Sequence, residues 1–125
     1  MKNDIQNRND IYLIIDEFYV KLLDDKLVKH FFIEILQKNH LEQHLNTITD
    51  FWNGILFSAT DYQRNAMYPH LVLNQTIPFK KEHFDRWLAH FNSAIDENFK
   101  GEKAEMAKTR ALSIATIMQI KMMNS

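Results

Sequence analysis

The sequence has 125 residues, of which 46% are hydrophobic and 12% aromatic, enough apolar material for the core of one domain. Fifteen basic residues against sixteen acidic ones give a formal net charge of -1 without a basic block, so we expect no nucleic-acid partner. The absence of cysteine excludes disulfides, thiolate zinc sites and iron–sulfur clusters, and two glycines are too few for a phosphate-binding loop.

The N-terminal stretch "MKNDIQNRND" is polar, and we interpret residues 1–9 as an extension of a single domain that spans residues 1–125. The apolar run after it, "IYLII", is too short for a signal-peptide core or a membrane span. We therefore expect a soluble, cytoplasmic protein with no membrane partner.

The first predicted helix follows an N-cap at Asn9 or Asp10 and ends near Asp24. Its apolar residues recur at intervals of three and four, as in a helix with one face in the core. They are Ile11, Ile14, Ile15, Phe18, Tyr19 and Leu22. A short helical piece is predicted next, around residues 27–35.

The second long helix has an apolar stripe that includes a histidine and ends where "SATDYQRNAMY" interrupts the pattern. The stripe comprises Leu41, His44, Leu45, Ile48, Phe51, Trp52, Ile55 and Leu56. Because the stripe continues for four turns, we expect His44 to point inward.

Two further helices complete the chain, the first entered after Pro78 and stopped by Gly101. The first buries Phe84, Trp87, Leu88, Phe91, Ile95 and Phe99, and the second Ala104, Ala107, Ala111, Ile114, Ala115, Met118 and Met122. The small residues of the last helix permit close helix packing. The predicted fold class is all-α.

Three residues with hydrogen-bonding groups lie on these apolar faces: Tyr19, His44 and Trp87. Each taken alone is usually a core residue whose polar atom finds a backbone partner. A fourth, His70, stands in the apolar stretch "AMYPHLVL", where its neighbours offer an imidazole few hydrogen-bond partners. Together they suggest a shared cavity. His83 and His90 flank Trp87, and we expect both on a solvated helix surface.

Two readings without a cofactor cavity stay open. "HLEQH" places His40 and His44 four residues apart on a helix, a spacing that can share one zinc ion. It is not a metalloprotease motif, because Leu41 occupies the position of the glutamate. The other reading is a cofactor-free helical interaction module.

The order and spacing of these segments resemble the truncated haemoglobins, specifically their third group, from about Ile11 to Met122. The most specific parts are the run FW-x(9)-Y-x(7)-H, from Phe51 to His70, and "HFDRWL", which begins at His83. The resemblance implies a shortened globin fold, a two-over-two helical sandwich around haem b.

The resemblance also assigns roles to individual residues. It makes His70 the proximal ligand of the haem iron, and it matches Phe31 to the family's phenylalanine that packs against the haem. The distal residues that stabilise a bound ligand correspond to Tyr19, His44 and Trp87, and Ile48 lines the same cavity. His44 could donate a hydrogen bond, act as a gate or ligate the iron.

The function implied by this resemblance is reversible binding of O2 and other diatomic ligands, NO and CO. Several donors around the ligand would slow its release, which favours ligand scavenging or oxygen-linked redox chemistry over oxygen transport. Nitric oxide dioxygenase or peroxidase-like turnover would need a separate reductase, since a chain of 125 residues leaves no room for one.

Overall fold

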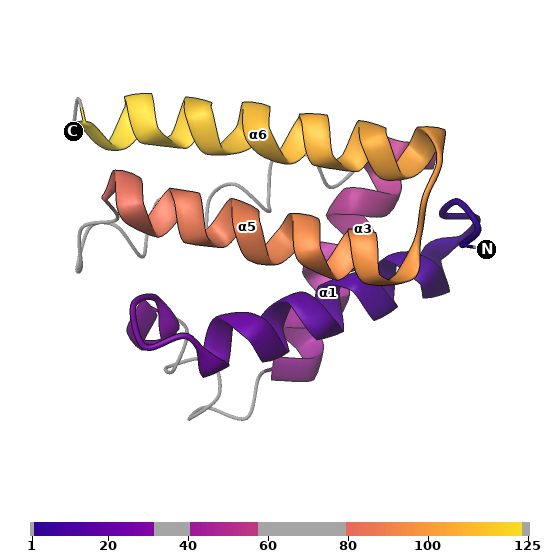
Figure 1. The fold of residues 1–125 in the computed structure, drawn as a ribbon, viewed down its shortest axis with the longest axis horizontal. Helices are drawn as coiled ribbons and strands as arrows, with labels where there is room; N and C mark the ends of the chain where they lie inside the picture. The colour runs from indigo at the N-terminus through magenta and orange to yellow at the C-terminus, as the bar shows by residue number, and fades with distance from the viewer. Residues whose placement is uncertain (1, 32–40, 58–79, 124–125) are drawn as a thin grey trace.

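The computed structural model describes residues 2–31, 41–57 and 80–123, and every long element among them is an α-helix. The elements are α1 (Arg8–Asp24), the 3-10 turn η1 (Lys29–Phe31), α3 (Leu41–Phe57), α5 (Lys81–Asn98) and α6 (Glu102–Met123). In Figure 1, α5 and α6 run side by side in opposite directions, α1 lies below α5, and α3 crosses behind. The prediction of an all-α chain is confirmed, and the described residues contain no strand.

The start of α1 differs from the prediction. The helix begins at Arg8 because the side chain of Asn7 accepts the backbone N–H of Asp10 at 3.0 Å, so the expected N-cap at Asn9 or Asp10 is wrong. Asn7, Asn9 and Asp10 are all good capping residues, and periodicity could not choose among them. The helix ends at Asp24, as expected.

Residues before α1 are integrated into the fold although their sequence is polar. Ile5 is 3% exposed and belongs to the core. The carboxylate of Asp4 accepts the backbone N–H groups of Lys103 and Ala104 at 2.8 and 2.9 Å, and so caps the first turn of α6. Gly101, with φ of 153°, leads into that turn, where a Cβ would lie 2.5 Å from the Asp4 carboxyl carbon.

The predicted apolar faces meet in one core. In α1 the buried residues are Ile11, Ile14, Ile15, Phe18, Tyr19 and Leu22, the full predicted set. In α6 the small residues Ala104, Ala107, Ala111 and Ala115 and the side chain of Met118 are all at most 2% exposed. Because alanine is small, α6 lies close to α5, while α1 packs between α3 and α5.

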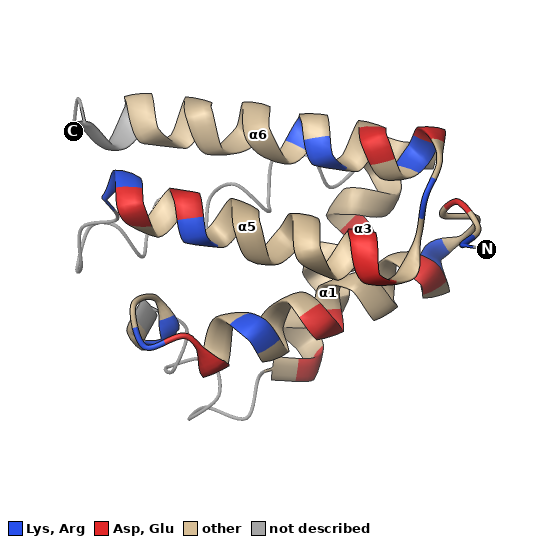
Figure 2. Cartoon of the chain, in the orientation of Figure 1, with Lys and Arg blue, Asp and Glu red and all other residues tan. Residues whose placement is uncertain are grey.

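Charges of both signs are mixed along the helices in Figure 2, whereas residues 111–120 of α6 include no Lys, Arg, Asp or Glu. None of the helices in the described residues is long and apolar enough to cross a membrane.

Candidate functional site

Tyr19 and His44 are in direct contact between α1 and α3. The Tyr19 hydroxyl and His44 Nε2 are 2.6 Å apart, and the two rings meet edge to face with centroids 5.1 Å apart. Tyr19 is 2% exposed and His44 is half-buried. Two residues that the sequence predicts to face inward therefore form one hydrogen-bonded pair.

Burial keeps both members of this pair uncharged near neutral pH. It raises the pKa of the Tyr19 hydroxyl, because a buried phenolate would lose its hydration. It lowers the pKa of His44 for the corresponding reason, since the imidazolium is the charged form. The pair is thus a neutral phenol beside a neutral imidazole.

Trp87 approaches this pair through Phe18. The Phe18 ring lies edge-on to Tyr19, with centroids 5.4 Å apart, and edge-on to Trp87 at 5.6 Å. Phe91, one turn beyond Trp87 on α5, lies nearly parallel to it at 6.0 Å and also meets Phe18 at 5.3 Å. Phe18 therefore lies between the Tyr19 and Trp87 rings and holds them apart. Sequence analysis missed this role because an apolar ring carries no motif.

Ile48 follows His44 by one turn of α3 and is 5% exposed. The other two predicted site residues cannot be placed from the described part of the chain. His70 lies outside the described residues, and Phe31 ends η1 with its side chain outside them. Their roles stay predictions.

The comparisons with known proteins show the family of this chain and the similarity of its fold. Residues 3–124 match the family described as bacterial-like globin. The chain belongs to this globin family. A group 3 truncated haemoglobin of Campylobacter jejuni is 29% identical over 121 residues, covering 95% of this chain and 93% of the relative. The crystal structure of group III truncated haemoglobin from the same organism superposes with a TM-score of 0.83 at 27% identity, covering 98% of this chain and 95% of that one.

The resemblance to third-group truncated haemoglobins and the expected globin fold are therefore confirmed. Globins bind haem and, through it, small diatomic ligands such as O2. Three described residues of this globin have the chemistry expected beside one face of a haem. Tyr19 and His44 offer neutral hydrogen-bonding atoms in a buried setting, and Ile48 adds an apolar side chain on the same helix as His44.

The remaining histidines on α5 differ from expectation. His83 is 8% exposed, and its Nδ1 accepts the backbone N–H of Lys80 at 2.8 Å at the start of α5, so its predicted place on a solvated surface is wrong. Burial lowers the pKa of His83 as well. His90 is half-buried and donates to Asp25, with 2.7 Å between Nε2 and Oδ2.

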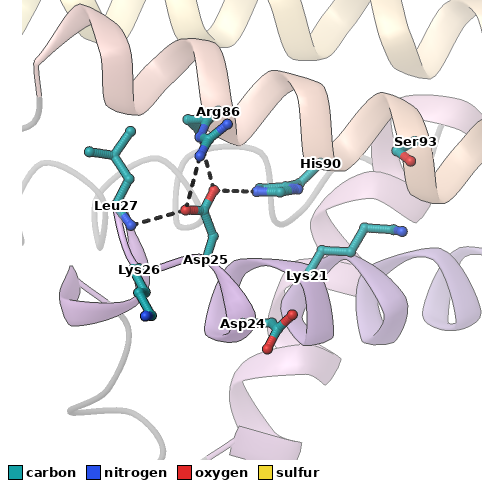
Figure 3. A pocket seen from close by; sticks show the side chains of 8 residues that line it. All are labelled: Lys21, Asp24, Asp25, Lys26, Leu27, Arg86, His90 and Ser93. Carbon is teal, nitrogen blue, oxygen red and sulfur yellow. Dashed lines mark hydrogen bonds and ion pairs between the residues drawn. The ribbon is translucent and has the colours of Figure 1, made fainter.

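A second polar cluster surrounds Asp25, where α1 ends (Figure 3). Arg86 and His90 reach it from α5, and together with Lys21 and Lys26 they line a surface depression of about 810 Å³. Sequence analysis missed this cluster because Asp25 and His90 are 65 positions apart. A charged residue at a helix end gives no sign of a partner so distant in sequence.

Among the described residues there is no group of three or more His, Cys, Asp or Glu side chains that could hold a metal ion. Of the pair proposed for a zinc site, His40 lies outside the described residues, while His44 directs Nε2 at the Tyr19 hydroxyl.

Proposed function

We propose that this globin binds haem b through His70 and reversibly holds O2, NO or CO beside Tyr19, His44 and Trp87. Its role in the cytoplasm is ligand scavenging or oxygen-linked redox chemistry rather than oxygen transport. The observation that carries the proposal is the Tyr19–His44 pair, a buried phenol and a half-buried neutral imidazole 2.6 Å apart in a chain of the globin family. The other residues that would contact the haem are Phe31 and Ile48.

When bound, the haem supplies the iron that coordinates the diatomic ligand. The protein supplies hydrogen bonds to it, and the Tyr19–His44 pair can be arranged in two ways. If the Tyr19 hydroxyl donates to His44 Nε2, its single proton is occupied. If the other tautomer of His44 donates from Nε2 to the phenol oxygen, the Tyr19 proton is free for the ligand.

The second arrangement also makes Tyr19 a stronger donor, because a hydrogen bond accepted by the phenol oxygen polarises its O–H group. His44 then acts on the ligand through Tyr19. This gives His44 a function beside Tyr19 even when its own ring does not reach the ligand.

Slow ligand release favours a chemical role over delivery. Converting nitric oxide and dioxygen into nitrate consumes one electron, NO + O2 + e⁻ → NO3⁻, so each turnover requires a separate reductant or reductase. Many oxygen-binding globins carry out one such turnover. Repeated turnover in a lysate of the host is therefore the informative observation: accumulation of ferric protein after one equivalent of nitric oxide would contradict the catalytic role.

The experiment that tests haem binding is absorption spectroscopy of the purified chain and of two histidine variants. We expect an intense Soret band from one haem per chain. His70→Ala should lose the haem, or retain it only with added imidazole, whereas His40→Ala should leave the band unchanged. An unchanged spectrum in His70→Ala would show that the proximal ligand is wrongly assigned.

The same spectra separate the alternatives. A cofactor-free interaction module gives no Soret band with either variant. A zinc site that uses His40 and His44 gives none either, and His40→Ala would lower its zinc content.

A further inference from the structure

Asp25 is a buried carboxylate at the junction of three elements. Its side chain is 7% exposed although it lies beside a surface depression. The carboxylate accepts the backbone N–H of Leu27 at 3.0 Å, His90 Nε2 at 2.7 Å and Arg86 Nε at 3.1 Å. Figure 3 shows Arg86 and His90 both reaching Asp25 from α5. We call Asp25, Arg86 and His90 the Asp25 cluster.

The backbone of Asp25 also shapes the chain that follows α1. Its N–H donates to the carbonyl of Leu22 at 3.2 Å, which closes the helix, and its carbonyl accepts from Lys29 at 2.8 Å. Lys29, the first residue of η1, is therefore hydrogen-bonded to the backbone of Asp25. This turn ends at Phe31, the residue predicted to pack against the haem.

Each element that meets at Asp25 carries one residue of the proposed haem cavity. Tyr19 lies six residues earlier on α1, a distance of about 9 Å along the helix axis. Trp87 lies on α5 between Arg86 and His90, the two partners of Asp25. Phe31 belongs to η1, which is tied to the Asp25 backbone, while the Asp25 carboxylate binds α5, so α1, α5 and η1 meet at this one residue.

The aromatic contacts between α1 and α5 cannot fix this arrangement alone. Phe18 packs edge-on against Trp87 and Phe91, and such contacts tolerate small displacements because dispersion and apolar burial have weak directionality. Hydrogen bonds to a carboxylate are directional and stronger when the donor is charged. The Asp25 cluster therefore supplies a directional link between the helices of Tyr19 and Trp87, and the other such links in the described part of the chain, Lys21–Glu97 and Asn98–Glu17, involve more distant residues of α5.

We propose that Asp25, held by Arg86 and His90, is a positioning residue that sets the Tyr19 and Trp87 donors at the distance the bound ligand requires. The expected effect on ligand release rests on the proposed function, whereas the expected displacement of Trp87 can be measured without any bound ligand. Losing the cluster leaves both donors present but displaced, so ligand release becomes faster without loss of either side chain.

The test compares Asp25→Asn with two matched controls. Asp24→Asn removes the neighbouring carboxylate, which is exposed and has no hydrogen bond to α5. Glu97→Gln weakens the more exposed tie between α1 and α5, in which Lys21 Nζ lies 2.7 Å from Glu97. The first measurement is the indole N–H signal of Trp87 in ¹H–¹⁵N NMR spectra, which needs no ligand chemistry, and Trp52→Phe assigns the two tryptophan signals.

Asp25→Asn should shift the Trp87 signal clearly more than the Trp52 signal, and more than either control does. In the haem-loaded protein it should also raise the O2 dissociation rate roughly threefold to tenfold. An unshifted Trp87 signal in a folded Asp25→Asn protein overturns the proposal, even where haem binding is normal. Failure to bind haem at all overturns the proposed function instead, and the two outcomes are thus distinguishable.

A second pair of variants covers the case in which Asp25→Asn does not fold. His90→Leu removes the donor to Asp25, and His90→Gln retains a side-chain N–H of similar reach. We expect His90→Leu to shift the Trp87 signal and His90→Gln to restore it. Equal shifts in both variants would mean that His90 acts only through packing, which contradicts the positioning role.

Discussion

Two histidines join α1 to neighbouring helices in opposite chemical settings. His44 on α3 meets a buried phenol, and burial lowers the pKa of its ring, so the contact with Tyr19 is between neutral groups. His90 on α5 meets a carboxylate beside solvent, with Arg86 on the same acceptor. The Tyr19–His44 contact can change its donor by a tautomer shift, whereas the Asp25 carboxylate can only accept, so the hydrogen bonds to it have one direction. The first setting suits ligand binding and the second suits positioning.

The largest effect is expected at Phe18, which lies between the rings of Tyr19 on α1 and Trp87 on α5. Phe18→Ala removes a fully buried ring that touches Tyr19, Trp87 and Phe91, and should cost about 3–5 kcal/mol in the free energy of unfolding. Urea denaturation measures this cost. Val20→Ala, at a position 63% exposed on the same helix, should change stability by less than about 0.5 kcal/mol. A small effect at Phe18 would mean that the two donors are spaced by other contacts.

The next largest effect is expected on ligand release when the hydroxyl of the Tyr19–His44 pair is removed. Tyr19→Phe keeps the ring and removes the hydroxyl, which should cost on the order of 1.5–3 kcal/mol of ligand stabilisation, roughly a 10- to 150-fold faster O2 release. Stopped-flow measurement of O2 dissociation checks this. Tyr12→Phe, on the partly exposed side of α1, is the control and should leave the rate unchanged. An unchanged rate in Tyr19→Phe would transfer the main role to Trp87 or His44.

As the pH falls, the folded state should lose stability at His44 before it loses stability at Asp25. Because the pKa of His44 is lowered in the folded state, the unfolded chain binds more protons, and stability falls as the pH drops below about 6.5. His83 contributes in the same direction. The pKa of Asp25 is also lowered, but in a lower pH range: desolvation raises it, while hydrogen bonds from His90 and Leu27 and the charge of Arg86 together outweigh that effect, so its contribution to stability is lost only as the pH falls below 3.8.

Urea midpoints measured between pH 7.5 and 3 test this order. His44→Gln should flatten the decline near pH 6 by less than about 1.4 kcal/mol per pH unit and leave the decline below pH 4 in place. A wild-type profile that is flat from pH 7 to 5 would contradict a buried neutral His44.

The smallest effect is expected at the exposed edge of the ionic cluster. Arg86 is 54% exposed, and Arg86→Gln should change the unfolding free energy by only about 0–1 kcal/mol, because solvent screens such pairs. Thermal unfolding measures it. A larger loss would show that Arg86, and not His90, carries the link to α5.

The sequence allows prediction of those features that depend on local pattern. Intervals of three and four place the buried faces of α1, α3, α5 and α6, including Tyr19 and Trp87, without knowledge of the tertiary fold. The resemblance to third-group truncated haemoglobins supplies the globin arrangement that periodicity cannot give.

Features that depend on pairs distant in sequence were not predictable. Asp4 caps α6 from 99 positions away, and Asp25 meets His90 across 65. Single acidic residues near a helix end have many possible partners, and only the packed helices select one. The choice of Asn7 as N-cap depends in the same way on where the preceding chain packs, since Ile5 must reach the core.

The most direct test of the account is the infrared C–O stretching frequency of the carbon monoxide complex, compared between the wild-type chain and Tyr19→Phe. Hydrogen bonds donated to the ligand lower this frequency. We therefore predict a lower value in the wild type, with a rise when the Tyr19 hydroxyl is removed. The same frequency in both proteins, or no carbon monoxide complex at all, would contradict the claim that the Tyr19–His44 pair faces a haem-bound ligand.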